Sequence, residues 1–128
     1  MYDIYYAHHQ WKYGSQVEEY ELDLIRRYFP NAKIFNPAVD LVSTKEDGEA
    51  VVMEECLSTV ENSDIFVFSS VNETVGIGVY QEVMHAKNCG KIIFYICKDA
   101  LTMDYQLTQR TDTGKTDRMF AFVNHDFY

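Results

Sequence analysis

Residues 64–96 read DIFVFSSVNETVGIGVYQEVMHAKNCGKIIFYI, and the pattern in this stretch decides the fold. It begins with the strand pattern of residues 64–68 and ends with the strand pattern of residues 91–96, both strongly apolar. Between them Val79, Val83 and Ala86 recur at helical spacing, and Gly90 is a typical C-terminal stop. The order strand, helix, strand predicts two parallel strands in a sheet that is covered on both faces.

The same alternation extends back to the start of the chain. Residues 2–7 predict a first buried strand, and residues 33–37 predict a second strand that breaks at its proline. One helix is expected after each of these strands, and each is preceded by a capping-box pattern: Ser15 with Glu18, and Ser43 with Glu46. We therefore expect an α/β fold, a small doubly wound parallel sheet of flavodoxin-like or Rossmann-like type, in one domain spanning residues 1–128.

The C-terminal part of the chain has a different pattern. Apolar residues alternate with polar ones from 101 to 107, residues 108–117 are polar, and residues 119–123 are apolar again. Period-two alternation on either side of a polar turn predicts a β-hairpin.

Composition limits the partners that the protein is expected to have. The net charge is −9, from 20 acidic and 11 basic residues, which disfavours nucleic acids and anionic membranes. The three cysteines have no paired spacing, and no apolar run is long enough to span a bilayer, so we expect a cytoplasmic protein. The 10 tyrosines and 8 phenylalanines exceed what so small a core can hold, which favours a homo-oligomer with an apolar interface.

Two familiar cofactor patterns fail on inspection. Gly76 and Gly78 begin a dinucleotide-binding pattern, but its third glycine is replaced by Gln81 and it follows the wrong strand. The loop after the first strand, residues 8–14, lacks the glycine- and hydroxyl-rich character of a flavin phosphate loop. No two histidines have metal-ligand spacing. We therefore expect neither a cofactor nor a metal.

Ligands of open parallel sheets bind beyond the carboxyl ends of the strands, where the winding reverses. The residues expected at these ends and in the following glycine turn are His8, Trp11, Asn36, Ser69, Glu73, Thr74, Gly76 and Gly78. Glu82 lies about one turn inside the next helix, where a carboxylate could attack the anomeric carbon of a sugar. Tyr5 could orient that carboxylate. The alternative is that Glu82 is an exposed helix residue favoured by the helix dipole.

Several short motifs resemble the nucleoside 2-deoxyribosyltransferases and the related nucleoside-monophosphate N-glycosidases. The first strand, Ile4-Tyr-Tyr-Ala7, is similar to the family's first strand, in which a tyrosine positions the catalytic carboxylate. The family's nucleophilic glutamate is matched by Glu82, and the residues that follow it in the family are matched by Ala86, Gly90 and Lys91. The resemblance covers residues 2 to about 97.

The resemblance implies cleavage or transfer of the N-glycosidic bond of a nucleoside or nucleotide. Glu82 would be the nucleophile, Tyr5 would position it, and Asn124 would reach the site of a neighbouring subunit. An aspartate that contacts the sugar in the family is replaced here by Gly76 or by Thr74, depending on the alignment. That replacement keeps open the alternative of a non-catalytic module that binds or sequesters a nucleotide.

Overall fold

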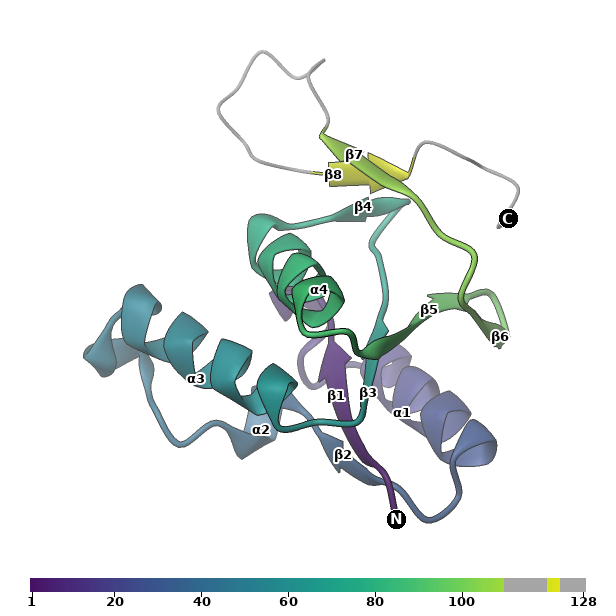
Figure 1. Ribbon diagram of the computed structural model, residues 1–128, viewed down its shortest axis with the longest axis horizontal. Coiled ribbons are helices and arrows are strands. Elements are labelled where there is room, and N and C mark those ends of the chain that lie inside the picture. The colour runs from purple at the N-terminus through teal and green to yellow at the C-terminus, as the bar shows by residue number, and fades with distance from the viewer. Residues whose placement is uncertain (110–119, 123–128) are drawn as a thin grey trace.

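The computed structural model describes residues 1–109 and 120–122, and it has the predicted α/β architecture (Figure 1). The main sheet has the strand order β2-β1-β3-β5-β6. Four of these strands are parallel: β1 (Asp3–Ala7), β2 (Lys33–Phe35), β3 (Ile65–Phe68) and β5 (Ile92–Cys97). The last strand, β6 (Ala100–Thr102), is antiparallel to β5. The winding reverses between β1 and β3, which confirms the doubly wound sheet.

Helices cover both faces of this sheet. The central strands are apolar at successive positions, so they present apolar side chains to both faces. Helix α1 (Gln16–Tyr28) packs on the face that contains Tyr6. Helices α3 (Glu49–Glu61) and α4 (Ile77–Asn88) pack on the face that contains Tyr5 (Figure 1). Neighbouring residues of β1 therefore serve two separate parts of the core.

Short helical turns connect these elements: η1 (Gln10–Lys12), α2 (Pro37–Asp40) and η2 (Lys45–Asp47). The predicted cap at Ser15 is confirmed, since its hydroxyl accepts the amide hydrogen of Glu18. The capping box predicted at Ser43 for the second helix is wrong: Thr44 and Asp47 form a capping box at the start of η2, and α3 begins after Gly48. The backbone amide and hydroxyl of Ser43 both donate to the carboxylate of Glu55, so Ser43 is already engaged.

A second, antiparallel sheet lies beyond the carboxyl ends of the parallel strands, close to the start of α4 (Figure 1). Its strands are β4 (Thr74–Val75), β8 (Phe120–Phe122) and β7 (Leu107–Gln109), in that order. Antiparallel pairing of β7 with β8 agrees with the predicted C-terminal hairpin, but its first strand is placed differently. Leu101 belongs to β6, which pairs with β5, and residues 108–109 of the predicted turn lie in β7. Residues 110–117 of that turn lie outside the described residues. Within the described ranges, no helix combines the length and apolar character needed to span a bilayer.

Candidate functional site

Tyr5 and Glu82 meet in the interior, as the sequence predicts. Tyr5 lies in β1 and Glu82 lies on the buried face of α4, so the packing of α4 on the sheet brings them together. The hydroxyl of Tyr5 donates a hydrogen bond to the carboxylate of Glu82. Tyr5 is fully buried and Glu82 is 7% exposed, so the alternative of an exposed helix residue is wrong.

Burial changes the pKa values of both members of this pair. Loss of water raises the pKa of Glu82 to about 7, although the hydrogen bond from Tyr5 opposes that rise. The pKa of Tyr5 rises well above its usual range, through burial first and through the nearby charge of Glu82 second. At neutral pH, therefore, Tyr5 remains a donor while Glu82 exchanges a proton readily, a property expected of catalytic carboxyl groups.

Cys56 of α3 is a third member of this cluster, and the sequence analysis did not identify it. Burial raises the pKa of its thiol to about 11, the hydrogen bond with Tyr5 lowers that pKa, and Glu82 raises it. The thiol is therefore neutral at physiological pH and packs as a polar neighbour of Tyr5. Its spacing in the apolar face of α3 indicates only a core residue, which explains why the sequence gives no functional signal.

The loop after β1 carries further aromatic residues. Burial raises the pKa of Tyr13 to about 12, and its ring lies 4.9 Å from that of His8, measured between centroids. His9 packs against Gly76, where an added Cβ would lie 3.4 Å from Cδ2 of His9. Trp11 is 75% exposed, and its ring lies 4.5 Å from that of His9, measured between centroids. The rings of His9 and Trp11 therefore lie beside the start of α4, the helix that carries Glu82.

A second polar cluster occupies the opposite face of the sheet, next to α1. The ammonium group of Lys12 donates to the carboxylate of Glu21 at 2.8 Å, to the hydroxyl of Ser69 at 2.8 Å and to the carbonyl of Ser70 at 2.7 Å. Glu21 also accepts hydrogen bonds from Ser69 at 2.8 Å and from Tyr6 at 2.5 Å. Among the described residues, every buried side-chain polar atom has a partner, so this cluster is internally satisfied.

His8 belongs to this second cluster rather than to the Glu82 site. Its Nε2 lies 2.6 Å from the carboxylate of Glu18, and its ring stacks on Tyr6. Burial lowers the pKa of His8, and the bond with Glu18 raises it in opposition. Because its side chain is fully buried, the structure gives His8 a role in joining the loop to α1.

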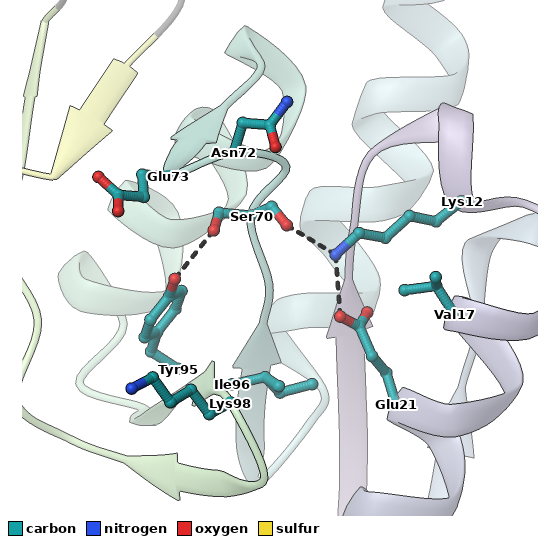
Figure 2. A pocket seen from close by; sticks show the side chains of 9 residues that line it. All are labelled: Lys12, Val17, Glu21, Ser70, Asn72, Glu73, Tyr95, Ile96 and Lys98. Carbon is teal, nitrogen blue, oxygen red and sulfur yellow. Dashed lines mark hydrogen bonds and ion pairs between the residues drawn. The ribbon is translucent and has the colours of Figure 1, made fainter. Parts of the chain in front are cut away.

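A cavity of about 430 Å³ opens beside the second cluster, between α1 and the ends of β3 and β5 (Figure 2). Figure 2 shows Lys12 joined to Glu21 and Ser70 on one side, and Tyr95 joined to Ser70 on the other. The other lining residues are Val17, Asn72, Glu73, Ile96 and Lys98. Of the predicted substrate-binding residues, Glu73 alone lines this cavity.

The remaining predicted residues have mainly structural contacts. Asn36 caps α2 through its side chain, and Thr74 donates to the carbonyl of Val71. Gly78 lies against the methyl group of Met53, where an added Cβ would be 3.7 Å away. Asn124 lies outside the described residues. The predicted site thus divides: Tyr5, Glu82 and Gly76 lie on one face of the sheet, and His8, Ser69 and Glu73 border the other cluster.

Comparison with known proteins does not identify a relative. No protein-family model matches the chain, and no curated protein resembles it closely enough to count as a significant match. The chemistry of the site is therefore argued from its own geometry.

Proposed function

We propose that the protein cleaves or transfers the N-glycosidic bond of a nucleoside or nucleotide, with Glu82 as the nucleophile. The observation that carries this proposal is the buried hydrogen bond from Tyr5 to the carboxylate of Glu82. Tyr5 lies two residues before the carboxyl end of β1, and open sheets of this type bind ligands beyond that edge. The motifs in β1 and α4 that resemble deoxyribosyltransferases support the same assignment.

The reaction would proceed in two balanced steps. The carboxylate of Glu82 attacks the anomeric carbon of the sugar, and the bond from that carbon to the base nitrogen breaks. The base leaves with the bonding electrons and takes a proton from solvent water. Water or a second base then attacks the same carbon and releases one proton to solvent, which breaks the ester and regenerates the carboxylate. Tyr5 fixes the carboxylate in one orientation throughout both steps.

The loop after β1 suits an aromatic substrate beside the helix that carries Glu82. Trp11 presents an exposed ring that is held against His9, and His9 packs against Gly76 at the start of α4. Flat aromatic side chains bind nucleobases by stacking, which discriminates little between bases. We therefore propose that a nucleobase stacks beside the loop of residues 9–13 while its sugar faces Glu82.

The direct test measures release of free base from a panel of nucleosides and nucleoside monophosphates, with and without a second base. Glu82→Gln keeps the size of the side chain but removes the nucleophile, so we expect base release to fall by at least about a thousandfold. The variant should retain ligand binding, since stacking contacts remain. An active Glu82→Gln protein would show that another group performs the chemistry.

The alternative is a non-catalytic module that binds or sequesters a nucleotide. The specific observation in its favour is that Glu82 is only 7% exposed. Equilibrium binding and base release, measured on the same samples, separate the two functions. Wild-type protein that binds a nucleotide and never releases base would establish the binding module and exclude the enzyme.

A further inference from the structure

Three potential metal ligands meet at the C-terminal ends of α3 and α4. Glu61 is the last residue of α3, His85 lies in the last turn of α4, and Cys89 caps α4. Their ligand atoms all lie within 4.8 Å of one another. Nε2 of His85 is 2.8 Å from Oε1 of Glu61. The spacing of four residues places His85 and Cys89 on the same side of the helix.

The geometry requires little movement to accept an ion. Ligand atoms in a tetrahedral zinc site with bonds of about 2.0 Å to nitrogen or oxygen lie roughly 3.3 Å apart. His85 and Glu61 would separate by about half an ångström to reach that distance, and the sulfur of Cys89, within 4.8 Å of both, would approach them by about 1 Å at most. Glu61 and Cys89 are exposed and His85 is half-buried, so all three side chains can adjust.

The backbone also favours a cation at this position. Helices α3 and α4 each lead into a parallel strand, so both end at the same edge of the sheet. A helix C-terminus carries about half a negative charge, and two such ends converge on the three side chains. An ordinary Glu61–His85 hydrogen bond accounts for two of the groups, but it gives no role to the thiol of Cys89.

We propose that Glu61, His85 and Cys89 bind a zinc ion, with the fourth coordination position open to solvent. A thiolate, an imidazole and a carboxylate together suit zinc, because harder ions such as Mg²⁺ and Ca²⁺ avoid sulfur and imidazole. The ion fastens the C-terminal ends of α3 and α4 to each other. These two helices also carry Cys56 and Glu82. Zinc would therefore restrain, at their C-terminal ends, the helices that contribute to the candidate catalytic cluster.

Cobalt(II) is the probe, because it replaces zinc in tetrahedral sites and absorbs visible light. Titration of the reduced full-length protein with Co²⁺ should give a thiolate-to-cobalt band in the near ultraviolet that saturates at one equivalent. Addition of Zn²⁺ should remove the band. Cys89→Ser should abolish it, and Glu61→Gln should weaken Co²⁺ binding by at least about tenfold. Cys97→Ser is the matched control, with the same number of thiols, and should retain the band.

Thermal unfolding supplies a second measurement that does not depend on glycosidic activity. Zn²⁺ should raise the midpoint of unfolding of the wild-type protein and of Cys97→Ser, and should leave Cys89→Ser unchanged. Absence of the cobalt band, or a band that survives Cys89→Ser, would overturn the zinc site. An equal rise of the midpoint in all three proteins would also overturn it, because the ion would then bind elsewhere.

Discussion

At the scale of the residue, the protonation of Glu82 connects stability with pH. Its pKa is about 7 in the folded protein, against 4.5 for an ordinary glutamate, because burial disfavours the charged form. The folded state therefore holds this proton more tightly than the unfolded state does. The resulting stabilisation is complete below pH 4.5 and is lost as the pH rises through about 7.

This linkage predicts that Glu82→Gln changes the pH dependence of stability. Between pH 5 and pH 8, the free energy of unfolding of the wild type should fall by about 2–3 kcal/mol relative to that of the variant. Glutamine does not titrate, and other titrating groups cancel in the difference. Urea denaturation of both proteins at several pH values measures the effect. Parallel pH profiles would show that Glu82 has an ordinary pKa.

Tyr5 should control the pH at which the proposed enzyme becomes active. Its hydrogen bond lowers the pKa of Glu82, so Tyr5→Phe should raise that pKa above about 7. Because the nucleophile must be ionised, the acidic limb of the profile of kcat/KM against pH should move to higher pH. Activity should recover partly in alkaline buffer. A loss by the same factor at every pH would instead indicate that Tyr5 contributes only packing.

At the scale of the element, buried charges hold the first loop and α1 against the sheet. Lys12 and Glu21 are only 10% and 8% exposed in their side chains. Removal of one partner from a buried ion pair leaves an uncompensated charge, so Lys12→Met should lower the free energy of unfolding by about 3 kcal/mol. The double variant with Glu21→Gln should lose less than the sum of the two single variants, by at least about 1 kcal/mol.

The exposed pair of Arg26 and Asp23 on the same helix is the control for this cycle. Its side chains are 52% and 62% exposed, so Arg26→Met should change stability by less than about 0.5 kcal/mol. Denaturant unfolding of all four variants completes the measurement. Strict additivity in the Lys12–Glu21 cycle would contradict the coupling.

The alternating strands and helices could be predicted from the sequence because their signals are local. The apolar run of residues 65–68 and the helical spacing of Val79, Val83 and Ala86 define β3 and α4 directly. The cap predicted at Ser43 is wrong because Ser43 donates to Glu55, 12 residues away, and α3 begins only after Gly48. Competition between a local cap and a tertiary hydrogen bond cannot be read from spacing alone.

At the scale of the whole molecule, the candidate site could be predicted only in part. The alternation of β1 places Tyr5 and Tyr6 on opposite faces, and this separates the Glu82 site from the Lys12 cluster. The sequence predicts a single crevice because it gives only the position of each residue along its strand. Cys56 joins the Glu82 site from α3, where its spacing indicates only packing. Glu21 joins the Lys12 cluster from α1, where a glutamate indicates only solvent exposure.

The aromatic-rich composition predicts a homo-oligomer, and apolar side chains exposed on the single chain favour the same prediction. Val42 is 89% exposed and Val39 is 74% exposed. Burial of such side chains between subunits would contribute about 25 cal/mol for each Å² removed from water. Light scattering at micromolar concentration should therefore give a mass of at least two chains of 15.0 kDa. Val42→Lys places a charge on this surface and should shift the distribution of masses toward that of the single chain. A 15 kDa particle for the wild-type protein would contradict the oligomer.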